Sequence, residues 1–157
     1  MSVWFRGSQN QQIEQVFSGE GGLFVAGRWN HKGTKAIYCS QSISLCTLEW
    51  LSHNGLSVSG FSYYKYSIDI PDELILKYSI SDLPVTWDLT PSPKANRDFA
   101  SKNFYIPNQY LAMSVPSVMV PEESNLIINP LNTAFKKVVE SILYLGNFTA
   151  PTRDRTR

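Results

Sequence analysis

The stretch from position 25 to position 40, VAGRWNHKGTKAIYCS, places an arginine, a tryptophan and an asparagine next to one another between two glycines. An ordinary β-turn needs only residues such as Gly, Asn or Asp, so Arg28 and Trp29 exceed what a turn requires. The planar guanidinium of an arginine can bind a phosphate through two parallel N–H donors. Two interpretations follow for this loop: an ordinary β-turn that carries large side chains without a binding role, or a binding loop for a flat, charged ligand.

Glu49 is the second residue whose surroundings indicate chemistry, and it lies within the segment SISLCTLEWLSHN. At about 100° per residue, apolar side chains point nearly all round this segment, which predicts a helix buried on most of its sides. Glu49 then faces apolar neighbours, where an ionised carboxylate needs a cation, hydrogen-bond donors or a ligand. A structural ion pair and a functional carboxylate both remain open from the residues alone.

Other kinds of catalytic site find little support in the sequence. There is no GxSxG motif, and His31 and His53 are the candidate bases, so a Ser-His-Asp triad is not indicated. Cys39 and Cys46 lack CxxC spacing, which argues against a zinc site and a disulfide framework. Ser117 follows a proline, a position typical of turns. Because the chain has only two histidines and its acidic residues are scattered, we expect no bound metal.

The elements that must position these residues are predicted from apolar periodicity and from turn residues. Ser42 is the expected N-cap of a helix that ends near Asn54, with Gly55 as its stop. Strands and helices mix without regular βαβ alternation, so we expect an α+β fold with antiparallel sheets. The strands are expected at residues 2–6, 35–40, 61–70, 110–120, 126–129 and, as a last buried strand, 138–145; further helices are expected at residues 72–78 and 97–104.

Composition limits the function further. The chain has 157 residues, of which 43% are hydrophobic, and this favours one folded domain spanning residues 1–157. A formal net charge of +1 gives no electrostatic reason for broad binding to nucleic acid or membranes. The sequence shows neither a signal-peptide pattern nor an apolar run of about 20 residues. We expect a cytoplasmic protein.

The order of these motifs is informative, because four separated blocks resemble the RES domain family, which is named for its arginine, glutamate and serine. The resemblance covers residues 3–146 and includes IDIPD at 68–72 and LPVTW at 83–87, leaving 147–157 as a terminal strand or tail. The sequence departs from the family pattern at three places. Lys32 stands where the family usually has proline, the segment 97–104 lacks the Gly and Trp commonly found there, and the chain end only faintly resembles the family's last strand. The matching positions are Gly27, Arg28, Trp29, Asn30, Gly33, Thr34, Tyr38, Leu45, Leu48, Glu49, Leu51, His53, Val115, Pro116, Ser117, Val120, Pro121, Glu122, Asn125, Asn129 and Pro130.

The resemblance implies an ADP-ribosyltransferase-like fold and a toxin of a type II toxin–antitoxin system that cleaves the nicotinamide–ribose bond of NAD⁺. It also implies an Xre-like helix-turn-helix antitoxin that covers the active site, within a complex that can hold a toxin homodimer. NAD⁺ would be the substrate, and no separate cofactor is expected. The implied catalytic residues are Glu49, Arg28, Tyr38 and Ser117, and the implied substrate-binding residues are Arg28, Tyr38, Trp29, Asn30 and Asn125.

The residue types agree with that chemistry. Cleavage of a glycosidic bond with a cationic leaving group passes through an oxocarbenium-like state, which a nearby carboxylate such as Glu49 stabilises. Arg28 can bind a pyrophosphate, while Tyr38 can stack on nicotinamide or fix the ribose. Water or phosphate could accept the ADP-ribose. The alternatives are an ADP-ribosyltransferase that modifies a protein or a nucleotide, and a catalytically inactive interaction module.

Overall fold

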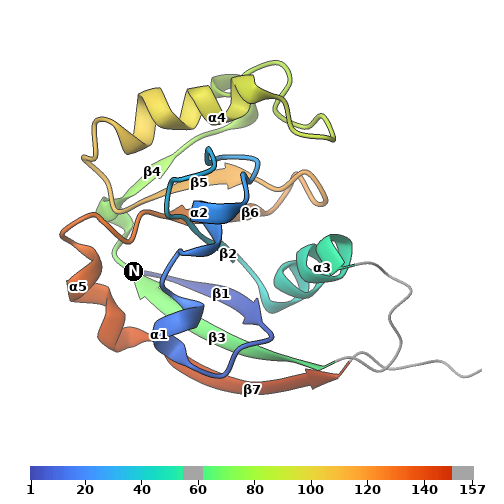
Figure 1. The fold of residues 1–157 in the computed structure, drawn as a ribbon, viewed down its shortest axis with the longest axis vertical. Coiled ribbons are helices and arrows are strands. Elements are labelled where there is room, and N and C mark those ends of the chain that lie inside the picture. Colours follow the sequence, from blue (N-terminus) through green and yellow to red (C-terminus); the bar gives the residue numbers. More distant parts are fainter. Residues whose placement is uncertain (55–61, 150–157) are drawn as a thin grey trace, which may run out of the picture.

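A computed structural model, which describes residues 1–54 and 62–149, contains one seven-stranded mixed sheet with the strand order β4-β5-β6-β2-β1-β3-β7 (Figure 1). The strands are β1 Ser2–Ser8, β2 Ile37–Ser40, β3 Ser62–Ile70, β4 Ile75–Lys77, β5 Ala112–Pro116, β6 Ser124–Ile128 and β7 Leu143–Thr149. β4 and β5 are parallel, and the other neighbours are antiparallel. The predicted α+β class is confirmed.

Short helices and one long helix flank the sheet (Figure 1). The longest, α3, has 12 residues. A π-helical turn, Ser101–Tyr105, continues α4 directly, so the helix predicted at 97–104 is present but begins earlier. The α-helices are α1 Ile13–Val16, α2 Gly21–Phe24, α3 Ile43–Asn54, α4 Lys94–Ala100 and α5 Phe135–Val138, and the 3-10 turns are Asp72–Leu74, Ile80–Asp82 and Val139–Ser141.

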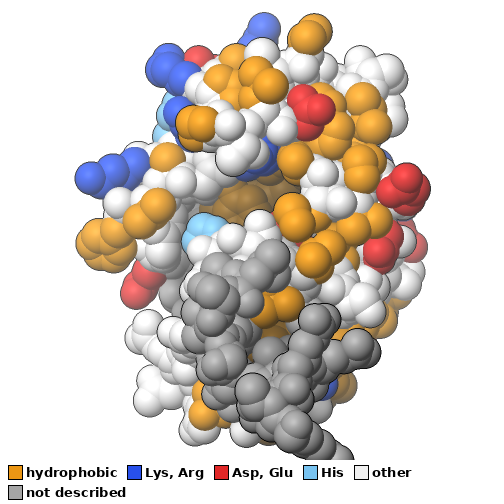
Figure 2. Space-filling view, turned by 90° about the vertical axis from the view of Figure 1, so that its right-hand side faces the viewer, with side chains coloured by type: hydrophobic (Ala, Val, Ile, Leu, Met, Phe, Trp, Pro, Cys, Tyr) orange, Lys and Arg blue, Asp and Glu red, His pale blue; other side chains and the backbone are white. Residues whose placement is uncertain are grey.

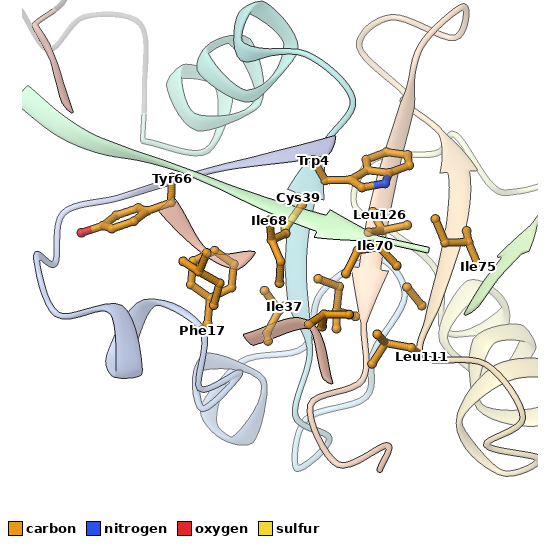
Figure 3. Packing of buried hydrophobic residues seen from close by; sticks show 14 of the residues in the cluster. Trp4, Phe17, Ile37, Cys39, Tyr66, Ile68, Ile70, Ile75, Leu111 and Leu126 are labelled. Carbon is orange, nitrogen blue, oxygen red and sulfur yellow. The ribbon is translucent and has the colours of Figure 1, made fainter. Parts of the chain in front are cut away.

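The two faces of the sheet carry separate hydrophobic clusters, because successive strand residues point to opposite faces. On β6, Leu126 and Ile128 belong to the first cluster, whereas Ile127 belongs to the second. The first cluster is closed by side chains from α1 and α5, including Val16 and Val138. Figure 3 shows Phe17, Ile37 and Leu126 among its members. The second lies under α4 and its π-helical turn. Tyr38 packs against this second cluster, so it lies on the α4 side of the sheet.

α3 begins as predicted and lies against β1 and β2. The Ser42 hydroxyl accepts a hydrogen bond from the Leu45 N–H at 3.0 Å, which is the expected N-cap. The prediction that this helix is buried on most sides is wrong. Only Leu45 and Cys46 are buried in it, and Ile43 is exposed. The predicted stop at Gly55 lies outside the described residues.

Two further predictions about elements are wrong. The segment 72–78 forms a 3-10 turn and then β4, because Ile75 to Lys77 pair in parallel with β5 and this pairing outweighs the local helical preference. The segment 138–145 is not a buried strand. Its first part is helical, and β7 follows at the end of the strand order, where Leu143, Tyr144 and Leu145 are exposed.

Candidate functional site

The loop with Arg28 and Trp29 is a tight turn built around Asn30. The Gly27 N–H donates to the Asn30 backbone oxygen at 3.1 Å and to Asn30 Oδ1 at 3.0 Å. The Tyr38 hydroxyl also donates to Asn30 Oδ1, at 2.6 Å. Asn30 Nδ2 reaches the oxygen of His31 at 3.2 Å. Asn30 is 1% exposed and Trp29 is 3% exposed, so these two side chains build the loop from inside.

Arg28 points away from that buried turn toward the segment that precedes α4. Its Nη1 donates to the carbonyl oxygens of Trp87 at 2.9 Å and Leu89 at 2.7 Å, and its Nη2 donates to Thr90 Oγ1 at 3.2 Å. A guanidinium has five N–H donors, so Arg28 retains donors for a ligand. Burial lowers the pKa of Arg28, and the negative charges of Glu49 and Asp88 oppose that shift. Arg28 and Glu49 therefore share one electrostatic environment.

Tyr38 joins the loop to the sheet. Its oxygen accepts a hydrogen bond from the Trp29 N–H at 3.1 Å while its proton goes to Asn30. Burial raises the pKa of Tyr38, opposed by the Trp29 N–H and by the positive charges of Arg28 and Arg97. The phenol therefore stays protonated at neutral pH, and its hydroxyl is already engaged. The ring, which is half-buried, is the part of Tyr38 that can contact a ligand.

Glu49 reaches from α3 to the ends of β5 and β6. Its Oε1 accepts hydrogen bonds from Ser117 Oγ at 2.7 Å and from Asn125 Nδ2 at 2.6 Å. No hydrogen bond joins Oε2 to any residue that the structure describes. The two oxygens therefore differ: one is held by neutral donors, and the other remains able to accept from a ligand.

Ser117 lies behind Glu49 and is 0% exposed. A serine hydroxyl has one proton and two acceptor sites. The proton goes to Glu49, and the oxygen accepts from the N–H groups of Met119 at 3.1 Å and Val120 at 3.2 Å. In this arrangement Ser117 has no proton to give to a ligand. Asn125 likewise faces Glu49, with its Oδ1 bonded to Ser40 Oγ at 2.9 Å.

The structure thus brings together the predicted Arg28, Tyr38, Glu49, Ser117 and Asn125 on the α4 side of the sheet, between α3 and α4 (Figure 1). From the side that carries α3, the surface is hollowed, with hydrophobic side chains on the floor and a Lys or Arg at its upper edge (Figure 2). Within residues 1–54 and 62–149, no group of three or more His, Cys, Asp or Glu side chains is arranged to hold a metal ion, and no helix there is long and apolar enough to cross a bilayer.

Three polar residues near the site were missed. Ser40 bonds Asn125, Asp88 acts on Arg28, and Arg97 acts on Tyr38. Ser40 had a signal, since it lies two positions after Tyr38 in the predicted strand and so shares its face. Asp88 and Arg97 had none, because only the folded chain brings residues 83–100 beside the loop of Arg28.

Comparisons with known proteins identify a family model, named relatives and a structural neighbour. The family model described as RES domain matches residues 3–150. A protein named Toxin Res from Yersinia enterocolitica is 32% identical over 138 residues, covering 88% of this chain and 90% of that protein. A protein named Prs ADP-ribosylating toxin, from Sphingobium, is 34% identical over 125 residues, covering 77% of this chain and 76% of that protein. A chain in the crystal structure of the M. tuberculosis MbcT–MbcA toxin–antitoxin complex superimposes with a TM-score of 0.68 at 16% identity, covering 94% of this chain and 83% of that chain.

Proposed function

The chain belongs to the RES domain family, and from this membership we propose that it is the toxin of a type II toxin–antitoxin system and that it cleaves the nicotinamide–ribose bond of NAD⁺. The observation that carries the chemical part is the asymmetric Glu49 carboxylate. Its Oε1 is held by Ser117 and Asn125, while its Oε2 has no hydrogen bond within the described part of the chain.

In the proposed reaction, the bond between the ribose carbon and the nicotinamide nitrogen breaks, and nicotinamide leaves with the bonding electron pair. The ribose carbon acquires oxocarbenium character, which the charge of Glu49 stabilises, and Oε2 accepts a hydrogen bond from a ribose hydroxyl. Water or phosphate then attacks that carbon and loses a proton. The products are nicotinamide and either ADP-ribose or its phosphorylated form.

Two residues would hold the substrate. Arg28 would bind the pyrophosphate with the N–H donors that the Trp87–Thr90 segment leaves unused. The ring of Tyr38 would stack on the nicotinamide, because its hydroxyl is already bonded to Asn30. Trp29 and Asn30 support this site from within the loop, since both are buried.

A transferase is the second candidate, and one relative favours it by name. The Sphingobium protein is named an ADP-ribosylating toxin. The same carboxylate would promote loss of nicotinamide, and only the acceptor of the ADP-ribose group would differ: a protein or nucleotide would replace water or phosphate. A third reading, an inactive interaction module, would keep the pocket without turnover.

The proposed setting is the cytoplasm, where an antitoxin would silence the enzyme. The M. tuberculosis structure is a toxin–antitoxin complex, and we extend that arrangement to this chain, with an Xre-like helix-turn-helix partner over the site. A homodimer of toxin within that complex is part of the proposal. No nucleic-acid contact by the toxin itself is included, in keeping with its net charge of +1.

The test is a product analysis with purified protein and NAD⁺. Mass spectrometry would distinguish ADP-ribose, its phosphorylated form and ADP-ribose attached to added proteins or nucleotides. Glu49→Gln should lower turnover by about 100-fold, the order of effect seen when one charge-stabilising group is removed. Glu140→Gln, an exposed residue near α5, should match wild type. An intact, folded wild-type chain that releases no nicotinamide would reject catalysis on NAD⁺.

A further inference from the structure

A chain of hydrogen bonds connects Glu49 to a serine that belongs to none of the family motifs found in the sequence. Ser40 is the last residue of β2 and lies directly across from Asn125 of β6 in the antiparallel register. Ser40 Oγ donates to Asn125 Oδ1 at 2.9 Å, and Asn125 Nδ2 donates to Glu49 Oε1 at 2.6 Å. The pairing of β2 with β6 therefore places Ser40 where the Asn125 side-chain amide connects it to the Glu49 carboxylate.

The two ends of that amide are chemically opposite. Nδ2 is a donor and suits a carboxylate, whereas Oδ1 is an acceptor and would repel it. Ser40 offers a proton at the far end and so favours the orientation in which Nδ2 faces Glu49. Ser40 is 5% exposed, so without its hydroxyl Asn125 Oδ1 would lose its partner where little water can replace it.

We infer that Ser40 is a positioning residue for Glu49, acting through Asn125 to keep Oε1 occupied and Oε2 turned toward the substrate. The assignment rests on the proposed function of Glu49. Ser117, which follows the end of β5 on the other side of β6, donates to the same oxygen. Because both donors reach Oε1, rotation of the carboxylate is restricted, and a correctly placed Oε2 is available before substrate arrives.

The kinetic test compares Ser40→Ala with Ser40→Thr, which retains the hydroxyl and suits a strand. Ser40→Ala should lower kcat about tenfold with KM little changed, which corresponds to loss of roughly one hydrogen bond. Ser40→Thr should recover most of the activity. The control is Ser114→Ala: Ser114 is also a strand serine and is 8% exposed, but it points to the opposite face of the sheet. An equal loss in Ser114→Ala would indicate general destabilisation and overturn the assignment.

A double-mutant cycle tests whether Ser40 acts through the amide. In an Asn125→Ala background, Ser40→Ala should cause little additional loss of kcat, because the intermediate group is already gone. Independent, multiplying losses would show that Ser40 acts by another route and would overturn the inference.

A measurement without NAD⁺ separates this inference from the proposed activity. In protein with ¹⁵N-labelled asparagine, the Asn125 side-chain amide should give one proton shifted downfield by its bond to the carboxylate, a signal assigned by its absence in Asn125→Ala. Ser40→Ala should reduce that shift and Ser40→Thr should keep it. If the shift responds in this way but no NAD⁺ is cleaved, the positioning network stands and the proposed function fails. If NAD⁺ is cleaved but the shift ignores Ser40, the inference fails alone.

Discussion

Arg28 combines a structural and a proposed binding role in one side chain. Three of its hydrogen bonds go to the segment Trp87–Thr90, two of them to carbonyl oxygens. The same guanidinium lies within the electrostatic reach of Glu49 and Asp88. A planar fork can hold the segment with one edge and a phosphate with another, whereas a lysine ammonium is a single point charge.

Arg28→Lys should therefore weaken NAD⁺ binding and loosen the Trp87–Thr90 segment. We expect KM to rise at least about tenfold, because charge-assisted hydrogen bonds contribute roughly 1.5–3 kcal/mol each. Steady-state kinetics at limiting NAD⁺ would measure the change. Lys32→Arg, at an exposed position of the same loop, is the control for exchanging one basic side chain for the other at unchanged charge. Unchanged activity in Arg28→Lys at limiting NAD⁺ would remove Arg28 as the phosphate ligand.

Burial of the two cysteines makes the free energy of unfolding depend on pH. Burial raises the pKa of Cys39 to about 12 and that of Cys46 to about 11, from an ordinary value of 9.0. Above about pH 9 the unfolded chain loses thiol protons that the folded chain keeps, so the unfolded state binds fewer protons. The free energy of unfolding must then fall as pH rises from about 9 to 11.

Urea unfolding between about pH 8 and pH 10 would measure this loss of stability. Cys46→Ala should lose less free energy of unfolding over this pH range than wild type does, because one buried thiol is gone. At about pH 8 the variant should nevertheless be less stable than wild type. At that lower pH, iodoacetamide should label both thiols slowly in the folded protein and rapidly in urea. Fast labelling of a thiol in the folded protein would show that this thiol is not buried and protonated there.

At the scale of the elements, the Gly27–Asn30 turn leaves no room for a side chain at position 27. A Cβ at Gly27 would lie 2.5 Å from Tyr38 Oη and closer still to Asn30 Oδ1. These two atoms form the hydrogen bond that joins the loop to β2. A side chain at position 27 would therefore separate Tyr38 from Asn30 and displace Arg28 with the turn.

Gly27→Ala should destabilise the fold by about 1–3 kcal/mol, the usual cost of overpacking, and should lower activity through displacement of Arg28. Thermal unfolding and steady-state kinetics would report the two effects. Gly21→Ala is the matched control, because a Cβ there meets nothing within 4 Å, and its effect should stay within about 0.5 kcal/mol. If both variants were equally stable, the Gly27 turn would be more adaptable than its geometry indicates.

Local signals predicted the elements that depend on neighbours in sequence. The Ser42 cap and the residue order of the Gly27 loop are such signals, and α3 and the loop form where they indicate. β4 and β7 were misjudged because tertiary pairing decides them: Ile75 pairs with Ala112, and β7 is placed by its pairing with β3. Ser40 had a local signal, because it shares the face of Tyr38 in its strand, but its partner in the site follows only from the register opposite Asn125.

At the scale of the whole molecule, the two faces of the sheet differ: one carries an apolar core cluster, and the other carries the candidate site. One face is closed by side chains from α1 and α5 over a continuous apolar cluster. The other is shared by α3 and α4, with the candidate site between them (Figure 1). Glu49 meets Ser117 and Asn125 across 68 and 76 positions of sequence. Complete folding is thus a condition for assembling the carboxylate and its donors.

This arrangement would allow a partner protein to inhibit the enzyme by binding directly over the candidate site. Arg28 and the unbonded oxygen of Glu49 belong to one site, so a protein that covers the site with an acidic group or a C-terminal carboxylate would compete with NAD⁺ for Arg28. We expect the proposed antitoxin to act in this way, without remodelling the sheet, because the site residues are held by strands and by α3. Competition of this kind makes a reciprocal prediction about two affinities.

In Glu49→Gln protein, which should bind NAD⁺ with little turnover, saturating NAD⁺ should weaken antitoxin binding, and saturating antitoxin should weaken NAD⁺ binding by the same factor. Isothermal titration calorimetry can measure both affinities with and without the other ligand. Arg28→Ala should reduce both affinities, because both ligands are proposed to use that cation, whereas the exposed Lys136→Ala should change neither. An antitoxin affinity that is the same with and without NAD⁺ would place the partner on another surface, and the covering model would then be abandoned.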